Sequence, residues 1–473
     1  MDTIHVDICV IGAGSGGLSV ASGASQMGAK VALIEKGEMG GDCLHTGCVP
    51  SKALLAAAHV AHTCRESAQF GIQGSEPLVD WSAVNRHLQQ VITSIAPNDS
   101  QERFEGLGVI VIRAAASFID SDTVRAGDQL IRAKYFVLAT GSSPFVPPIE
   151  GLNEVPYFTN ENLFSNREAV KHLIVIGGGP IGIEMAQAHR RLGAKVTVIE
   201  MARLLMKDDP ELTKIVIQRL QQEGLEFHEG GRGLRLEKTA DGKIAAFCNT
   251  DGGVQCAIGS HLLIATGRRA NVSGLNLEAA GISYSPHGVD VDARLRTSNK
   301  KVFAIGDVAG PYQFTHMAAY QAGIVIRNML FKLPAKVDYS AVPWVTYSDP
   351  ELAYVGLSEA DAVKVGIAIR VLRWSFAEND RAQSEKRTEG LIKVITTPKG
   401  VILGAGIVGL HAGELIQPWI LAIGQKMRIG AIASMIAPYP TMAEANKRIA
   451  GSFYTDKLFS SATRRVVRLL LKI

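Results

Sequence analysis

Cysteine is scarce in this sequence, with six residues among 473. Cys43 and Cys48 form the one close pair, and the others are scattered along the chain. Few and scattered cysteines argue against a secreted protein held together by disulfides, so we expect a protein of the reducing cytoplasm. No second pair of Cys or His residues with zinc-type spacing occurs, and we therefore predict no metal site.

The sequence also has little net charge and no targeting segment. Its 49 Lys and Arg residues against 45 Asp and Glu residues leave a net charge of +4, which does not call for a nucleic-acid partner. No basic, apolar leader opens the chain. Residues 8–29 are uncharged, but their glycines and serines fit a strand, a loop and a helix better than a membrane span. We expect a soluble protein.

The length of the chain indicates several hydrophobic cores. A chain of 473 residues is too long for one ordinary core, and an apolar fraction of 47% with 20% charged residues provides material for more than one. Strand-like runs alternate with glycine turns and helical stretches. We therefore predict an α/β protein of about three domains.

The first of these alternating units begins near the start of the chain. The apolar run of residues 5–11 is followed by Gly12, Gly14 and Gly17, then a helical stretch, then a second apolar run that ends at Glu35. Such glycines permit a tight turn, a close approach of the backbone to a pyrophosphate, and close packing of helix on strand. An acid at the tip of the second strand can accept hydrogen bonds from ribose hydroxyls. This pattern predicts a dinucleotide site.

The same unit recurs later in the chain. Residues 172–176 are apolar, Gly177, Gly179 and Gly182 form the turn, and a second strand ends at Glu200. Two such units predict two dinucleotides and electron transfer between them. The alternative is a duplicated fold that has lost one of its ligands.

Glu200 also bears on the choice of cofactor. A carboxylate accepts a hydrogen bond from a free 2′-hydroxyl but repels a 2′-phosphate, so NAD is favoured over NADP. Arg203 lies nearby in the sequence and could soften this preference.

The close cysteine pair lies in residues 40–52, GGDCLHTGCVPSK. Pro50 and the good helix formers of residues 52–58 place Cys48 at the start of a helix, where unpaired amides and the helix dipole favour a thiolate. A ring closed by Cys43 and Cys48 is small and easily reopened, which suits a redox couple. Two buried free thiols and half of a metal site are the alternatives.

This string resembles the redox-active motif of the class I pyridine nucleotide-disulfide oxidoreductases, the flavoenzyme family of dihydrolipoamide dehydrogenase, glutathione reductase and mercuric reductase. The resemblance runs over nearly the whole chain. It implies two Rossmann-like dinucleotide-binding domains, one for FAD at residues 1–146 and 269–338 and one for NAD(P) at 147–268. It also implies an α+β dimerisation domain at 339–473 that forms a homodimer; the alternative is a third domain without a pairing function.

The resemblance assigns the cofactor-binding residues. It gives the first glycine unit to FAD and the second to the nicotinamide cofactor, and it has Asp307 hold the ribityl chain and Thr315 contact the flavin end. The chain crosses between the two domains at two strands that end in Ala-Thr-Gly. The implied FAD residues are Gly12, Gly14, Gly17, Glu35, Lys52, Ala116, Thr140, Gly141, Asp307 and Thr315, and the implied NAD residues are Gly177, Gly179, Gly182, Glu200 and Gly267.

The resemblance also assigns the redox roles. Cys48 faces the flavin, and Cys43 is the interchange thiol that meets the substrate. Lys52 lies one helical turn past Cys48 and stabilises a reduced flavin and the thiolate by its charge. Glu184 matches the family's partner of that lysine; its alternative is an ordinary surface acid.

The chain departs from the family at Tyr439, where dihydrolipoamide dehydrogenase and glutathione reductase have the histidine of a His-Pro-Thr-x-x-Glu motif contributed across the dimer. A phenol with a pKa near ~10 is a poor proton acceptor at neutral pH, whereas an imidazole near ~6.5 is suited to the task. Glu444 keeps the motif's acid. His45 is a candidate substitute base, although a solvated or loop-capping histidine is the more common case.

Tyrosine near this position is a feature of mercuric reductase, which residues 346–352 also resemble. That enzyme carries a further cysteine pair near its C-terminus, and this sequence has no cysteine after Cys256. We therefore predict an FAD-dependent NAD(P)H oxidoreductase that acts, like dihydrolipoamide dehydrogenase, on a lipoyl, disulfide or other small-molecule substrate. A mercuric reductase-like reductase of metal ions or quinones and a redox-sensing flavoprotein are the alternatives.

The last ten residues, 464–473, are basic and apolar. Such a segment can lie on an anionic membrane or dock a partner, but more often it packs on its own dimer.

Overall fold

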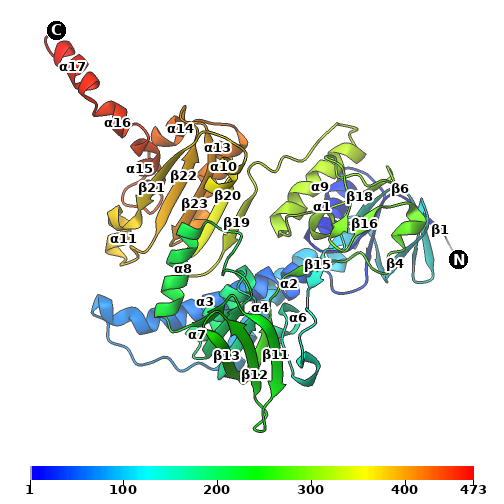
Figure 1. The fold of residues 1–473 in the computed structure, drawn as a ribbon. Helices are drawn as coiled ribbons and strands as arrows, with labels where there is room; N and C mark the ends of the chain where they lie inside the picture. Colours follow the sequence, from blue (N-terminus) through cyan, green and yellow to red (C-terminus); the bar gives the residue numbers. More distant parts are fainter. Residues whose placement is uncertain (1–2) are drawn as a thin grey trace. The chain divides into compact units, whose positions relative to one another are not determined.

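The computed structural model describes residues 3–473 and divides the chain into two compact units (Figure 1). Unit 1 comprises Met1–Met201 and Gly230–Val337, and unit 2 comprises Ala202–Glu229 and Asp338–Ile473. The segment Ala202–Glu229 lies in the range predicted for the NAD(P) domain, but by its contacts it belongs to unit 2. The division into FAD, NAD(P) and dimerisation domains stays a prediction.

Unit 1 contains a seven-stranded sheet of order β3-β2-β1-β6-β5-β4, in which β18 pairs with β6 in addition. β1 (Thr3–Ile11) lies between β2 (Val31–Glu35) and β6 (Gln129–Leu138) and is parallel to both. α1 (Ser15–Gln26) connects β1 to β2, so the predicted order of strand, loop, helix and strand is confirmed. The other strands are β3 (Ile110–Arg113), β4 (Ala116–Asp120), β5 (Thr123–Ala126) and β18 (Val302–Ala304).

Both faces of this sheet are covered, as expected for a mostly parallel sheet. Side chains alternate along β1: Ile8 and Val10 belong to the apolar cluster formed with α1 and α9 (Thr315–Met329), whereas Cys9 and Ile11 belong to the cluster on the other face. This burial explains why residues 8–11, the second half of β1, are all apolar.

A second parallel set of strands in unit 1 repeats this plan. β8 (His172–Ile176) pairs with β9 (Lys195–Glu200) on one side and β14 (His261–Ile264) on the other. α7 (Pro180–Arg191) begins within the predicted glycine turn, before Gly182, because proline fits the first turn of a helix. An antiparallel sheet of β11 (Arg232–Lys238), β12 (Ile244–Thr250) and β13 (Gly253–Gly259) follows.

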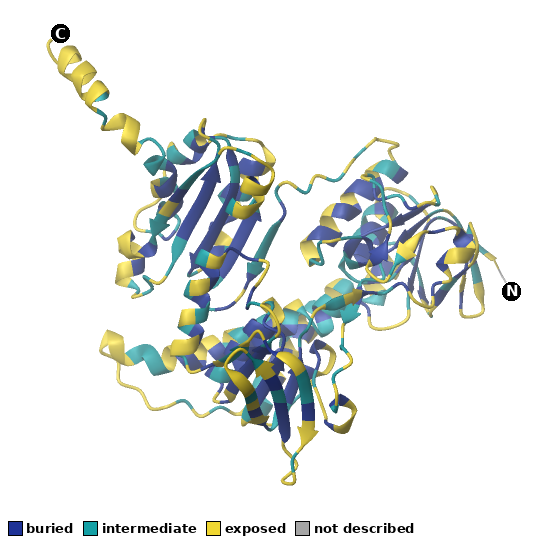
Figure 2. Cartoon of the chain, viewed as in Figure 1, coloured by how far each residue is buried: buried dark blue, intermediate teal, exposed yellow. Residues whose placement is uncertain are grey.

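Unit 2 is built on a five-stranded antiparallel sheet of order β19-β20-β23-β22-β21. α13 (Gln417–Gly424) and α15 (Glu444–Ser452) pack on one face, where Trp419 and Ile449 share an apolar cluster with alternate strand residues. α8 (Pro210–Gln222) covers the other face. The strands are β19 (Pro343–Thr346), β20 (Glu351–Gly356), β21 (Arg370–Ser375), β22 (Leu391–Thr396) and β23 (Ile402–Gly409), and Figure 2 shows the central ones as mostly buried.

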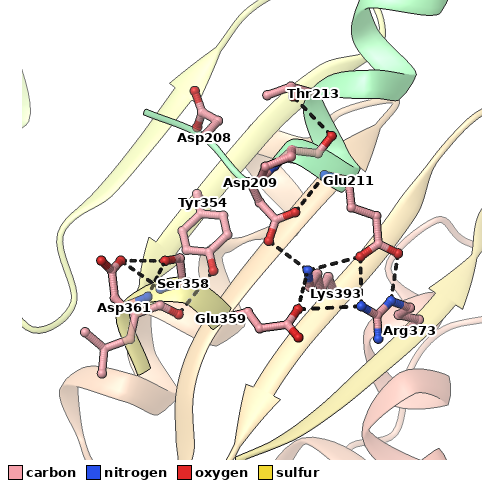
Figure 3. Close-up of polar contacts among 12 residues, drawn as sticks. Asp208, Asp209, Glu211, Thr213, Tyr354, Ser358, Glu359, Asp361, Arg373 and Lys393 are labelled. Carbon is pink, nitrogen blue, oxygen red and sulfur yellow. Dashed lines mark hydrogen bonds and ion pairs between the residues drawn. The ribbon is translucent and has the colours of Figure 1, made fainter. Parts of the chain in front are cut away.

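A buried lysine lies on the α8 face of this sheet (Figure 3). The side chain of Lys393 is 4% exposed, and its Nζ lies 2.8 Å from Asp209 Oδ2, 3.0 Å from Glu211 Oε2 and 2.8 Å from Glu359 Oε2. Burial alone would lower the pKa of Lys393, but hydrogen bonds to these three carboxylates outweigh it and raise the pKa. Arg373 binds Glu211 through two further hydrogen bonds of 2.7 and 2.9 Å.

The chain ends in α16 (Thr455–Leu458) and α17 (Ser461–Leu470). Among the described residues, no helix is both long enough and apolar enough to cross a membrane.

Candidate functional site

The cysteine pair lies on two consecutive helices of unit 1. Cys43 belongs to the short helix α2 (Gly41–His45), and Cys48 is the first residue of α3 (Cys48–Glu66). The predicted placement of Cys48 at a helix start is therefore confirmed, whereas α2 was not predicted. No side chain at the N-terminus of α3 accepts a hydrogen bond from the first amides of the helix.

Cys43 and Cys48 are both free cysteines in this structure, which corresponds to the reduced form of the predicted redox pair. A hydrogen bond from Cys43 lowers the pKa of Cys48 to about 6, with desolvation opposing the shift. The hydroxyl of Thr315 and the charge of Lys52 lower the pKa of Cys48 further. The same hydrogen bond to Cys48, together with burial, raises the pKa of Cys43. Near neutral pH the pair therefore holds one thiolate, on Cys48, and one thiol.

Lys52 and Thr315 approach Cys48 from two helices. Lys52 lies on α3 one turn past Cys48, and its Nζ is 2.8 Å from Glu184 Oε2 on α7. The side chain of Glu184 is 7% exposed, so it is the partner of Lys52 rather than a surface acid. Thr315, the first residue of α9, places Oγ1 3.4 Å from Cys48 Sγ.

An arginine that the sequence analysis did not single out connects two acids near the pair. Arg268 Nη2 lies 3.1 Å from Asp42 Oδ2, and its Nε lies 3.9 Å from Asp307 Oδ2. Ser142 donates a hydrogen bond of 2.5 Å to Asp307 and accepts one of 2.7 Å from Arg268. Burial raises the pKa of Asp307, and the Ser142 hydrogen bond opposes the shift. The one signal in the sequence was the position of Arg268, directly after an Ala-Thr-Gly strand end.

The glycine loops show a form that fits a dinucleotide. A Cβ added at Gly12 or Gly17 would collide with backbone atoms of Ala139 or Gly12, whereas a Cβ added at Gly14 meets no heavy atom within 4 Å. Gly12 has a φ of 104°, a conformation that L side chains rarely adopt. The loop is thus packed on one side and open at Gly14, at the N-terminus of α1 where phosphates bind. These residues fit the adenine dinucleotide part of FAD.

The second loop has the same construction. A Cβ at Gly177 or Gly182 would collide with backbone atoms, and a Cβ at Gly179 has open space around it. The acids of the two units also correspond: Glu35 Oε2 accepts a hydrogen bond of 2.6 Å from the Ala13 amide, and Glu200 Oε2 accepts one of 2.7 Å from the Gly178 amide. Each carboxylate is therefore held at the open edge of its own glycine loop, where a ribose would lie.

The remaining predicted cofactor residues are spread over the strand ends of unit 1. Thr140 Oγ1 donates a hydrogen bond of 2.8 Å to the Asn271 carbonyl, beside Gly141. Gly267 follows β14 and has no heavy atom within 4 Å of an added Cβ. Ala116 is the first residue of β4 and is buried in the apolar cluster.

Tyr439 and Glu444 both lie in unit 2. Within the described residues, 3–473, their side chains bind different partners and form no hydrogen bond with each other. The Tyr439 hydroxyl donates a hydrogen bond of 3.0 Å to Asp380 Oδ2, which raises the pKa of Tyr439. Glu444 Oε1 instead accepts hydrogen bonds from Arg448 one turn along α15. Asp380 had no sequence signal, because it lies 59 residues from Tyr439.

His45 caps the redox loop. Its Nε2 lies 2.8 Å from the Met39 carbonyl oxygen, and because a carbonyl only accepts, Nε2 carries the proton. This contact favours the loop-capping interpretation over the substitute base. Arg203, the residue considered for a 2′-phosphate, donates hydrogen bonds to Thr213 Oγ1 and to the Met206 and Asp208 carbonyls within unit 2.

Comparison with known proteins gives a consistent result. The profile of the pyridine nucleotide-disulphide oxidoreductases matches residues 6–322, and the profile of their dimerisation domain matches residues 342–450. The chain is 34% identical over 458 residues to a mercuric reductase of Streptomyces lividans, covering 95% of this chain and 96% of the relative. It is 35% identical to a dihydrolipoyl dehydrogenase of Geobacillus stearothermophilus over 459 residues, with 93% and 94% covered.

The fold is also that of a solved flavoprotein. The Cu(II) complex of the HOCl-induced flavoprotein disulfide reductase RclA from Escherichia coli superposes with a TM-score of 0.84 at 25% identity, covering 94% of this chain and 99% of the other.

Proposed function

Since this chain belongs to the class I pyridine nucleotide-disulfide oxidoreductases, we propose that it is an NADH-driven reductase of a soft metal ion such as Hg(II) or Cu(II). The chain is an FAD- and NAD(P)-dependent enzyme. In the proposed reaction, its Cys43/Cys48 pair passes the electrons to the metal ion. The observation that carries this choice is the Tyr439 hydroxyl, which donates to Asp380 and has a raised pKa. A phenol that keeps its proton at neutral pH cannot serve as the base that dithiol exchange needs.

Several properties of the site support a metal acceptor. When bound, FAD supplies the transfer of two electrons from NAD(P)H to a disulfide. The chain then holds a thiolate at Cys48, stabilised by Cys43, Thr315 and Lys52, and thiolates are the preferred ligands of soft metal ions. One NADH and two Cu(II) ions yield NAD⁺, one proton and two Cu(I) ions; with Hg(II), one ion is reduced to Hg(0). Neither balance requires a proton acceptor at position 439.

The similar proteins are consistent with a metal ion as the electron acceptor. Several are mercuric reductases, and the solved structure of RclA is a Cu(II) complex. The second candidate is disulfide or dithiol exchange of the dihydrolipoamide type, which the dihydrolipoyl dehydrogenase relatives and the retained Glu444 favour. The match to the dimerisation domain at residues 342–450 supports a homodimer.

An acceptor panel with the FAD-loaded, full-length protein tests the proposal. We expect anaerobic NADH oxidation with Hg(II) or Cu(II) and little NAD⁺ reduction with dihydrolipoamide. Fast turnover of dihydrolipoamide by the unaltered protein, without turnover of either metal ion, would contradict the metal proposal and favour the second candidate.

Tyr439→His is the matched variant. A general base contributes about 10²- to 10⁴-fold, so dihydrolipoamide turnover should rise by on the order of 10²-fold near neutral pH. Tyr157→His, at a half-exposed tyrosine of unit 1, is the control and should leave turnover as it was. If Tyr439→His gives no rise, proton transfer at this position does not limit the dithiol reaction.

The cofactor preference has its own test at Glu200. Glu200→Ala removes the carboxylate that lies at the second glycine loop, so discrimination against NADPH should fall by roughly 10-fold or more. The ratio of kcat/KM for NADH to that for NADPH measures this change. Glu154→Ala, at an exposed acid of unit 1, controls for the loss of one negative charge. An unchanged ratio in Glu200→Ala would count against the role of Glu200.

A further inference from the structure

Helix α17 presents both of its faces to solvent. None of the residues of α17 (Ser461–Leu470) is buried, and Figure 2 shows the helix as almost entirely exposed. Leu469 is 64% exposed, and Leu471, directly after the helix, is 80% exposed. The dimerisation-domain profile ends at residue 450, so this helix lies outside the matched part of the family.

The side chains of this segment separate into two faces at helical spacing. At about 100° per residue, the basic residues fall within one third of the helix circumference and the aliphatic residues cover most of the rest. Leu458 and Phe459, just before α17, are exposed as well. The basic residues are Arg464, Arg465, Arg468 and Lys472, and the aliphatic residues are Val466, Val467, Leu469, Leu470, Leu471 and Ile473.

The charge of the protein is concentrated in the same place. The C-terminal segment, residues 457–473, contains five of the 49 basic residues and none of the 45 acids, so the rest of the chain has 44 basic and 45 acidic residues. Among residues 3–473, no basic side chain of α17 forms an ion pair. A positively charged face with no acid on the same segment is complementary to a negatively charged surface.

We propose that α17 binds the surface of an anionic membrane, lying in the plane of the lipid headgroups. Its aliphatic face would enter the boundary of the acyl chains while the arginines and Lys472 stay among the phosphates. Ten helical residues span about 15 Å, half of the hydrocarbon thickness of ~30 Å, so the helix lies on the membrane rather than across it.

A second copy of this chain fits the helix less well. Two packed helices bury a narrow seam of residues at every third or fourth position, whereas the aliphatic residues of α17 extend over about 160° of the helix circumference. A lipid surface can cover a face of this width, and it supplies the negative charge that the neighbouring residues of the segment lack.

Vesicle flotation of the FAD-loaded, full-length protein tests this inference. We expect binding to vesicles of phosphatidylglycerol and phosphatidylcholine, little binding to phosphatidylcholine alone, and weakening as salt rises. The variant Arg464→Ser/Arg465→Ser/Arg468→Ser should weaken binding by on the order of 10²-fold, since each basic residue near an anionic surface strengthens it roughly five-fold. Leu469→Ser/Leu470→Ser should weaken it by at least 10-fold.

Lys214→Ser/Lys364→Ser/Lys399→Ser removes the same charge from exposed lysines elsewhere in unit 2 and should leave binding unchanged. Equal binding to neutral and anionic vesicles, or equal loss in this control, would overturn the proposal. Dissociation of a dimer by Leu469→Ser/Leu470→Ser, seen by light scattering without lipid, would also overturn it by assigning the aliphatic face to a second copy. The result is independent of which acceptor the redox pair reduces.

Discussion

Replacing Cys43 by alanine is expected to lower turnover with every external acceptor by ~10³-fold or more and to raise the pKa of Cys48. The hydrogen bond from Cys43 is the largest cause of the low pKa of Cys48, about 6, and alanine removes it. Thr315 and Lys52 remain and keep part of the shift. The variant also lacks the second sulfur, so no disulfide can form between these positions.

The pH dependence of alkylation measures the thiol. In the reduced, unaltered protein, Cys48 should react with iodoacetamide with a midpoint near pH 6, because only the thiolate is a nucleophile. In Cys43→Ala the midpoint should move toward the ordinary value of ~8.5, and the reactive fraction at pH 7 should fall by up to roughly 30-fold. Mass spectrometry distinguishes Cys48 from the other exposed thiols, Cys64 and Cys256.

Cys64→Ala is the matched control, since Cys64 is an exposed cysteine of α3, the helix that begins with Cys48. It should change neither turnover nor the alkylation midpoint of Cys48. A midpoint that stays near pH 6 in Cys43→Ala would show that the helix N-terminus and Lys52 suffice without the neighbouring thiol.

The parts of the fold that the sequence predicted are those set by local patterns. The strand, glycine loop and helix of each dinucleotide unit lie within about 30 consecutive residues, and their periodicity and glycine spacing are visible without any long-range contact. The start of α3 at Cys48 followed from the helix formers after Pro50. α2 was missed because Gly40 and Gly41, at its start, are typical of a turn.

The parts that could not be predicted join residues far apart in the chain. Lys52 and Glu184 are separated by 132 residues, and only the family resemblance paired them. Arg268 meets Asp42 and Ser142, and Tyr439 meets Asp380, through contacts for which no spacing rule exists. Such side-chain pairs depend on how elements pack, so a single sequence shows the residue types but not the partners.

Lys393→Met is expected to destabilise unit 2 by about 3 kcal/mol, because it leaves buried carboxylates without their cation. Asp209 is as buried as Lys393, with 4% of its side chain exposed, and it also accepts the Glu211 amide at the start of α8. Glu211 and Glu359 are 37% and 41% exposed and can turn toward water, which keeps the effect at the lower end of the range for buried pairs. The thermal midpoint should fall by roughly 6–12 °C.

The sign of the pH dependence follows from the pKa shifts. The pKa of Lys393 is raised, so its stabilising contribution is present below the unfolded pKa and is lost only as pH rises through the folded pKa. Hydrogen bonds from Arg373 and Lys393 lower the pKa of Glu211, so that contribution is lost as pH falls through its folded pKa. The difference in thermal midpoint between the unaltered protein and the variant should therefore be constant from about pH 5 to about pH 9 and shrink in acid.

Lys364→Met, at an exposed lysine on the same unit, is the matched control and should change the midpoint by about 1 °C or less. Asp209→Asn combined with Lys393→Met should restore part of the loss, since the pair then leaves no deeply buried charge unpaired. If Lys393→Met is as stable as Lys364→Met, water or a rearranged Arg373 solvates the three acids. In that case the lysine does not hold α8 on the sheet of unit 2.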